Sequence, residues 1–247
     1  CSLERLWWRG GFPPALLARN DKVSWQWRQD FVRTFLQRDL PALQPGAPTA
    51  QIERFWRMLA HWHGNVWNAA ELARSLGTND AAVRRHLDLL AQTFMIRVLQ
   101  PWHENLAKRQ VKSPKVYVAD SGLLHSLLGI SSPDELLGHP KLGASWEGFV
   151  ISQLVQRLGA RSEECHFWAT HQGAELDLLV VRGKRRLGFE VKRAEAPAPT
   201  KSMHIALQDL ALDELTVVHG GKENWPMGPK MRAVAAAHLL QQVTPLK

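Results

Sequence analysis

The apolar residues of this chain change their spacing along the sequence, and this change limits the folds that the chain can adopt. In the first half they recur every three or four positions, as with Val23, Trp27 and Phe31, which is the repeat of an amphipathic helix. From about His166 onward apolar and polar residues alternate, which is the repeat of a strand with one buried face. The sequence therefore predicts a mixed α+β protein whose N-terminal part is helical.

Breaks in the pattern divide the 247 residues into three regions. The predicted regions are a helical segment at 1–58, a second domain at 59–135 and a third at 140–247. Helices are expected at 22–39 and 49–63, because the stretch 41–48 between them holds three prolines and a glycine and cannot continue a helix.

The second region has the order of elements of a winged helix-turn-helix. Asn68 can cap a short helix over 69–76, and a polar turn after Gly77 leads into a second helix that ends near Thr93. Two strands with a basic stretch between them follow, at 94–99, 116–119 and 101–115. A basic hairpin after a recognition-type helix is typical of winged helices.

Basic residues of this region are the candidate contacts to nucleic acid, with DNA as the expected partner. The chain carries a formal charge of +8, which favours polyanions as partners. Arg84 and Arg85, near the start of the second helix, are expected to reach into a groove, and the basic stretch is expected to contact phosphates. The expected phosphate contacts are Lys108, Arg109, Lys112 and Lys115. The alternative is a helix pair or winged helix that binds protein.

The third region is expected to be a compact mixed α/β unit. The elements predicted in it are a helix at 145–158, strands at 166–169, 175–181 and 187–192, a helix at 202–212, a strand at 215–219 and a final helix at 231–243. Alternation along the second strand places Glu175, Asp177 and Leu179 on one face, and along the third strand it places Glu190 and Lys192 together. Two carboxylates and a lysine are thereby expected to meet on neighbouring strands.

Such a group can hold a hard divalent cation. Mg²⁺, or Mn²⁺ in its place, takes one or two carboxylates plus waters and substrate phosphate, and Asp177 and Glu190 would supply the carboxylates. Lys192 beside the metal can orient a water or neutralise phosphate charge. Glu147, on the preceding helix, can add a further carboxylate. The alternative is a surface hairpin whose Glu190 and Lys192 are ordinary solvated charges.

In this order, Glu147, Asp177, Glu190 and Lys192 resemble the core of the PD-(D/E)xK nucleases, the restriction-endonuclease-like proteins. The resemblance implies a restriction-endonuclease-like α/β domain with these four residues at catalytic positions and the metal on Asp177 and Glu190. The proline of the motif is absent, and Leu176 stands in its place.

A wider resemblance covers nearly the whole chain. The segments LWWRGGFPP, FLQRDL, KSPKVYVADSGL, GASWEGFV, HQGAELDLLV and GFEVK look like a family of prokaryotic AAA-type ATPases. In that family a nucleoside triphosphatase precedes a winged helix and a nuclease-like domain of unknown function. This sequence contains no G-x-x-x-x-G-K-[ST] phosphate loop. An ATPase half, and with it ATP binding, is therefore expected upstream of Cys1.

Several other classes of protein are disfavoured. Two cysteines without metal-ligand spacing argue against a disulfide scaffold and for a cytoplasmic protein, and no apolar run is long enough for a membrane span. His61 and His63 lack partners at zinc spacing, and no G-x-S-x-G elbow occurs.

Two functions are compatible with these patterns. The first is a nucleic-acid-directed module of an ATPase, with a winged helix that binds DNA and a metal-dependent domain that hydrolyses phosphodiester bonds. The second is a non-catalytic module for regulation, homo-oligomerisation or docking of protein partners. The second has no need for Asp177, Glu190 and Lys192 to converge, so the sequence favours the first.

Overall fold

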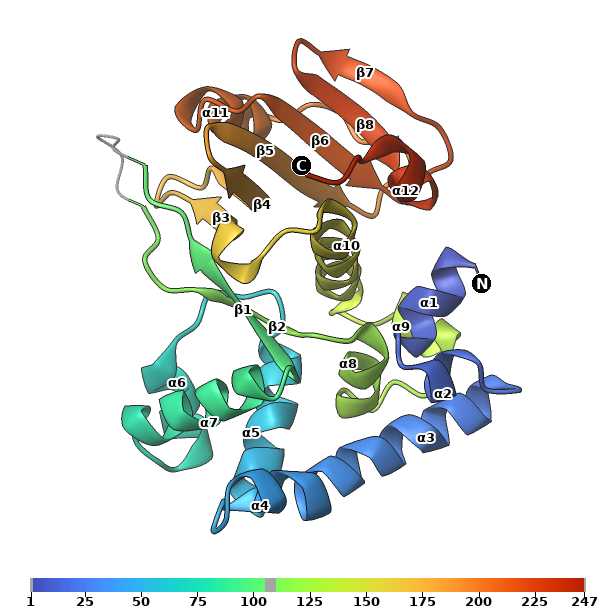
Figure 1. Ribbon diagram of the computed structural model, residues 1–247, viewed down its shortest axis with the longest axis vertical. Helices are drawn as coiled ribbons and strands as arrows, with labels where there is room; N and C mark the ends of the chain where they lie inside the picture. The colour runs from blue at the N-terminus through green and yellow to red at the C-terminus, as the bar shows by residue number, and fades with distance from the viewer. Residues whose placement is uncertain (1, 105–109, 247) are drawn as a thin grey trace. The chain divides into compact units, whose positions relative to one another are not determined.

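The computed structural model describes residues 2–104 and 110–246, which form two compact units. Unit 1 comprises Cys1–Val98 and Val116–Gly148, and unit 2 comprises Leu99–Lys115 and Phe149–Lys247. Unit 1 is mainly helical and unit 2 is built on a sheet, which confirms the mixed α+β prediction (Figure 1). Lys108 and Arg109 lie outside the described residues.

Four helices of unit 1 lie near the ranges predicted from the sequence, and the others were not predicted. Helical structure also continues through Leu43, so the expectation that the stretch 41–48 breaks the helix is wrong for its first residues. The helices are α1 (Leu3–Arg9), α2 (Pro13–Leu16), α3 (Asp21–Thr34), which a π-helical turn (Phe35–Asp39) continues, α4 (Leu40–Leu43), α5 (Thr49–Trp62), α6 (Ala69–Leu76), α7 (Asp80–Gln92), α8 (Ser121–Leu127) and α9 (Pro133–Leu137). The side chain of Asn68 caps α6, and Gly77 ends that helix in the left-handed conformation with φ at 69°. Asn79 caps α7, so a turn of three residues separates the two helices.

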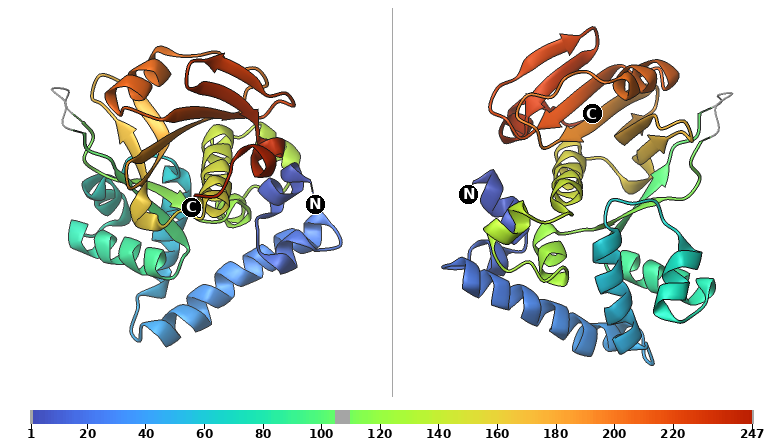
Figure 2. Two further views of the ribbon diagram at one scale, coloured as in Figure 1. Left: turned by 45° about the horizontal axis from the view of Figure 1, so that its top comes forward. Right: turned by 180° about the vertical axis from the view of Figure 1, so that it is seen from behind.

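One hydrophobic core extends through unit 1. Val32 of α3, Trp56 of α5, Leu90 of α7 and Leu124 of α8 all belong to it. The boundary predicted near residue 58 lies within α5, and the helices on both sides of that position share this core. Helices α6 and α7 pack beside α5 in each view of the molecule (Figure 2).

Two segments that are far apart in the sequence meet in unit 1 through glycines. Asp120 caps α8 with one carboxylate oxygen, and its other oxygen accepts a hydrogen bond of 2.7 Å from the Gly11 amide. A Cβ atom on Gly122 would lie 2.1 Å from the carbonyl oxygen of Arg9. The Gly-Gly stretch after α1 and the Asp-Ser-Gly stretch that begins α8 are therefore matched structural partners.

We expect Gly122→Ala to destabilise unit 1 by about 1–3 kcal/mol, because the added methyl group must displace the Arg9 backbone. Gly143→Ala is the matched control, since a Cβ atom at Gly143 in α10 (Leu142–Leu158) meets nothing within 4 Å. Urea denaturation of both variants measures the difference. Equal midpoints for Gly122→Ala and the parent would contradict this close approach.

Unit 2 contains the strands that carry the candidate site. Its elements are β3 (Cys165–Ala169), β4 (Glu175–Arg182), β5 (Arg185–Lys192), α11 (Lys201–Asp209), β6 (Glu214–His219), β7 (Trp225–Gly228), β8 (Met231–Ala235) and α12 (Leu239–Gln242). With β1 (Ile96–Pro101) and β2 (Lys115–Val118), the strand order of the mixed sheet is β2-β1-β3-β4-β5-β6-β8-β7. The strands β3, β4 and β5 form an antiparallel meander, and β5, β6 and β8 are parallel.

The final helix predicted at 231–243 is wrong for its first half. Met231–Ala235 is the strand β8, which pairs in parallel with β6, and only Leu239–Gln242 is α-helical. An alanine-rich apolar run that is buried on both faces has no periodicity that separates strand from helix. The parallel pairing with β6 decides its structure.

Helix α11 covers one face of the sheet (Figure 2). Met203, Ala206 and Leu210 pack there against Leu176 and Leu215 of the strands. This packing holds β4, β5 and β6 in fixed register, so side chains at the ends of these strands have defined positions.

Candidate functional site

The hairpin of β4 and β5 positions the predicted carboxylates. Its antiparallel pairing runs from Arg182 opposite Arg185 at the turn to Leu178 opposite Phe189. Asp177 and Glu190 are the next residues along the two strands, directly beyond the last of these pairs. The prediction that the two carboxylates lie on adjacent strands is confirmed.

The predicted alternation of side chains between the two faces of β4 is broken next to Asp177. The register with β3 shifts: His166 pairs with Leu179, but Trp168 pairs with Leu176, so β4 has one extra residue over this stretch. Leu176 and Leu179, three residues apart, consequently share the core under α11. Such a bulge bends a strand locally and re-aims a side chain, and here it lies beside Asp177.

The Asp177 carboxylate is turned toward the neighbouring strand. Its Oδ2 atom accepts a hydrogen bond of 2.8 Å from the backbone amide of Val191. On the same strand, Nζ of Lys192 lies 2.7 Å from Oε1 of Glu190. Asp177 is 7% exposed and Glu190 is 5% exposed. The alternative of ordinary solvated charges therefore does not describe Glu190.

A second lysine, which the sequence predicts to contact phosphate, lies among these carboxylates. Lys115 is 5% exposed and forms an ion pair with Glu175, and its Nζ lies 4.0 Å from Oδ1 of Asp177. The ammonium group also lies 5.6 Å from the centre of the Phe167 ring. The structure thus places Lys115 in the protein interior, whereas a phosphate contact requires an exposed side chain.

We name the group formed by Lys115, Glu175, Asp177, Glu190 and Lys192 the carboxylate cluster. Lys115 and Glu175 are the members whose roles sequence reasoning missed. No spacing in the sequence signals that Lys115 reaches β4, because more than fifty residues separate it from Glu175.

Glu147, the fourth residue predicted at a catalytic position, belongs to unit 1. Its Oε1 atom accepts a hydrogen bond of 2.6 Å from the Tyr117 hydroxyl. The next residue, Gly148, lies close to His63, since a Cβ atom there would be 2.5 Å from Nε2 of that ring.

The donor atoms of the carboxylate cluster suit a hard divalent cation. Asp177 and Glu190 offer carboxylate oxygens, and the Lys115 ammonium is itself a cation held against Asp177. Among residues 2–104 and 110–246, no group of three or more His, Cys, Asp and Glu side chains is arranged to hold a metal ion. A cation at this place would take two protein carboxylates, with water or phosphate oxygens at its other positions.

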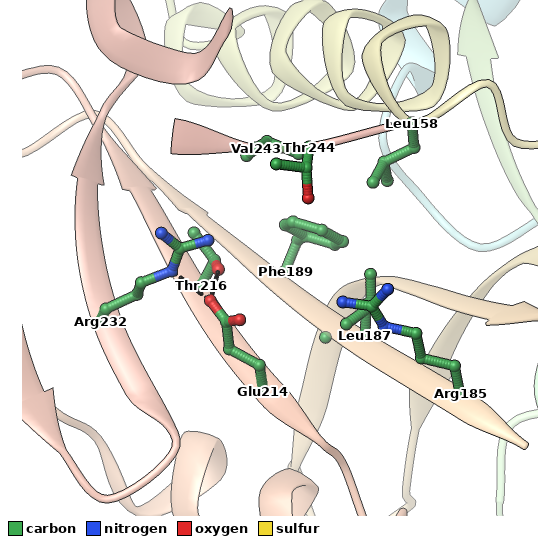
Figure 3. Close-up of a pocket in the computed structure, with 10 residues that line it drawn as sticks. Leu158, Arg185, Leu187, Phe189, Glu214, Thr216, Arg232, Val243 and Thr244 are labelled. Atoms are coloured by element: carbon green, nitrogen blue, oxygen red, sulfur yellow. Dashed lines mark hydrogen bonds and ion pairs between the residues drawn. The ribbon is translucent and has the colours of Figure 1, made fainter. Parts of the chain in front are cut away.

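A hollow of about 270 Å³ on unit 2 is lined by Thr170, Gln172 and Ser202, and the Ser202 hydroxyl accepts a hydrogen bond from the amide of Glu175. It therefore lies next to the carboxylate cluster. Another hollow of unit 2, about 30 Å³, lies above the ring of Phe189, and no member of the cluster lines it (Figure 3).

The basic residues predicted to contact nucleic acid differ in their surroundings. Arg84 and Arg85 are exposed on α7, and Lys112 is exposed between β1 and β2. The described ends of the basic stretch are attached to β3, through hydrogen bonds from the amide of Trp102 to Phe167 and from the amide of Val111 to Ala169. In the described residues, the stretch thus forms part of unit 2 and carries Lys115 to the cluster.

These features define a two-unit α+β protein with buried, lysine-paired carboxylates at the end of a strand hairpin. The chain belongs to the family described as "Domain of unknown function (DUF8612)", whose model matches residues 2–134. Residues 142–239 match a second model, "Domain of unknown function (DUF4143)", a domain often found at the C-terminus of AAA ATPases. This supports the coarser part of the predicted resemblance, an ATPase-associated C-terminal domain.

The curated relatives are similar over most of this chain. The uncharacterized proteins Rv2008c of Mycobacterium tuberculosis and Mb2031c of Mycobacterium bovis are each 46% identical to it over 237 residues, which is 96% of this chain. The match covers 53% of each relative, so the chain spans about half of their length. No solved structure matches the chain. In the described part of the chain, no helix has the length and apolar character needed to cross a membrane.

Proposed function

We propose that the chain is the nucleic-acid-directed part of an AAA-type ATPase and that its carboxylate cluster supports metal-dependent hydrolysis of phosphodiester bonds. The observation that carries the proposal is the convergence of Asp177, Glu190 and Lys192 where the pairing of β4 and β5 ends. Both carboxylates are buried and each is held by an amide or an ammonium group, so their oxygen atoms are fixed at the end of the hairpin. A docking module gains nothing from such an arrangement.

The residues of the cluster have separate roles in this proposal. Asp177 and Glu190 would hold Mg²⁺ or Mn²⁺, which supplies Lewis-acid activation of a phosphate oxygen and of a bound water. The Val191 amide fixes the Asp177 carboxylate before any ligand binds. Lys192, whose side chain is 41% exposed, can stabilise charge on the phosphate from the solvent side. The hollow beside Glu175 offers room for a neighbouring part of the substrate.

Cleavage assays test the proposal directly. Labelled single- and double-stranded DNA and RNA are incubated with the chain in Mg²⁺, in Mn²⁺ and in excess EDTA. We expect cleavage with either metal and none in EDTA, because the ion supplies the Lewis-acid activation of the water and of the phosphate. Intact substrates under every metal condition, with a chain shown to be folded, would favour the module for docking or oligomerisation instead.

Arg84 and Arg85 on α7 form the proposed contact to DNA in unit 1. We expect the double variant Arg84→Ala/Arg85→Ala to weaken binding and to lower the salt dependence by about one unit of slope for each phosphate that is no longer neutralised. Arg33→Ala is the matched control, since Arg33 is an exposed arginine on α3 of the same unit. Fluorescence anisotropy between low and moderate salt measures both quantities. Unchanged binding of the double variant would remove α7 from the DNA surface.

The basic stretch carries the remaining contacts proposed from the sequence, at Lys108, Arg109 and Lys112. Lys115 is assigned to the carboxylate cluster in this proposal. The AAA-type ATPase activity, and ATP itself, are proposed to reside in the part of a longer protein that corresponds to the other half of the relatives. That protein is proposed to act in the cytoplasm.

A further inference from the structure

We propose that Lys115 competes with the divalent cation for the carboxylate cluster, so that metal binding requires the Lys115 side chain to leave Asp177. This inference rests on the proposed function and assigns to the site a residue that controls its affinity for metal.

The Lys115 ammonium group lies where it would repel a metal ion bound to Asp177. Its ammonium group forms an ion pair with Glu175 and lies 4.0 Å from Oδ1 of Asp177. A cation bound to Asp177 would lie at a similar distance from the ammonium group, and like charges this close in a partly buried site repel strongly. The ammonium and the metal ion therefore exclude each other at Asp177.

The charges of the carboxylate cluster match a divalent cation only when Lys115 is absent. The carboxylate cluster has three carboxylates and two ammonium groups, which leaves one negative charge in excess. Without Lys115 the excess is two, which matches one divalent cation. Lys192 can stay, because its side chain is 41% exposed and solvent screens its charge, whereas the side chain of Lys115 is only 7% exposed.

Lys115 also occupies a particular place in the chain. It is the last residue of the segment Leu99–Lys115 of unit 2, and Val116, which follows it, belongs to the core of unit 1. Lys115 is thus held by its backbone at the start of β2, and only its side chain has to move to leave Asp177. Lys112, three residues earlier, is exposed and has no part in the cluster.

Titration of the chain with Mn²⁺, followed by isothermal calorimetry and by the loss of the free-ion EPR signal, tests the inference. We expect Lys115→Met to bind Mn²⁺ about tenfold more tightly or better, because a repelling charge is removed at nearly constant side-chain volume. Lys222→Met, which replaces an exposed lysine of the same unit, is the matched control and should bind Mn²⁺ as the parent does. Equal or weaker binding by Lys115→Met, with binding by the parent intact, overturns the competition and leaves the proposed function standing. Absence of Mn²⁺ binding by the folded parent and by folded Lys115→Met overturns both.

A measurement on the parent chain covers the case in which Lys115→Met does not fold. Amine acetylation with an activated acetate ester, read by mass spectrometry, reports the accessibility of each lysine. We expect Lys115 to react slowly without metal and severalfold faster with saturating Mn²⁺, while Lys112 reacts equally in both. An acetylation rate of Lys115 that Mn²⁺ does not change would contradict the inference.

Discussion

Replacing Asp177 with alanine is expected to abolish Mn²⁺ binding together with cleavage of nucleic acid. Asp177 and Glu190 are the two carboxylates that would hold the ion, and one alone binds it too weakly to act at millimolar concentration. The expected loss of cleavage rate is at least about 10²-fold, the scale seen when a group that stabilises transition-state charge is removed.

The surroundings of Asp177 call for a second variant that separates the loss of charge from the loss of a hydrogen bond. Asp177 is buried and accepts a hydrogen bond from the Val191 amide, so alanine also removes a structural interaction. Asp177→Asn keeps an acceptor oxygen for that amide and removes only the charge. Both variants should lose metal binding, and Asp177→Asn should keep the parent's melting temperature more closely. Glu223→Ala, which replaces an exposed acidic residue of the same unit, is the control that should cleave normally.

Replacing Lys192 is expected to separate metal binding from turnover. We expect Lys192→Met to bind Mn²⁺ nearly as the parent does, because solvent screens the charge of this 41% exposed side chain. It should nevertheless turn over about 10²-fold more slowly or worse, because the ammonium group stabilises charge on the phosphate. A calorimetric titration and a single-turnover assay on the same preparation separate these two effects. Should Asp177→Asn cleave at the parent's rate in the same Mg²⁺, the site is misassigned and the docking module becomes the better account.

The second large effect concerns stability in acid. His63 and His125 are buried in unit 1, and burial lowers the pKa of each ring to about 3 from 6.5. Their hydrogen bonds fix the neutral form. The Val118 amide donates to Nδ1 of His63, and Nδ1 of His125 donates to the carbonyl of Trp8 while Nε2 accepts from the Ser145 hydroxyl. Protonation of His63 would place an N–H group against the Val118 amide, and protonation of His125 would require the Ser145 hydroxyl to turn from donor to acceptor.

Because the folded-state pKa lies below that of the unfolded chain, the unfolded chain takes up protons first as the pH falls. The stabilisation from each histidine is complete above about pH 6.5 and is lost progressively from pH 6.5 toward pH 3. Each ring should lower the free energy of unfolding by about 1.4 kcal/mol per pH unit in this range. Unit 1 should therefore lose about 5 kcal/mol between pH 7 and pH 4.5 from the two rings together.

Urea denaturation at several pH values, followed by tryptophan fluorescence, measures this loss. His125→Gln should be less stable than the parent at pH 7 and should show a shallower dependence on pH, by about one proton. If His125→Gln and the parent depend equally on pH, the ring is not the group that titrates.

In the region 59–135 the sequence indicates the helix caps, whereas the burial of its lysines depends on tertiary packing. Asn68 and Gly77 act at the helix ends where the sequence places them, and Asn79 caps the next helix within the predicted polar turn, because a cap is satisfied within a few residues. Lys115 has an equally basic sequence environment to Lys112, yet one is buried and the other exposed. Only the attachment of their segment to β3 separates them.

In unit 2, likewise, some features follow from the sequence and others only from the tertiary structure. The hairpin of β4 and β5 follows from alternation and a glycine turn, so the sequence is enough to place Asp177 and Glu190 on adjacent strands. The extra residue in β4 is not predictable in this way, because a bulge depends on the register with β3 and is marked by no particular residue type. The strand β8 is wrongly predicted as a helix for a related reason, since its parallel partner β6 is distant in sequence.

The sequence by itself determined the mixed α+β class, the ends of helices α5, α6 and α7 and the pairing of the two candidate carboxylates, since each depends on interactions between residues close along the chain. Only the tertiary structure decided that Asp177 and Glu190 are buried, that a bulge lies beside Asp177 and that Lys115 joins them. Burial and ion pairing are set by which distant segments pack together, and a charged residue has the same local pattern whether it faces solvent or a carboxylate.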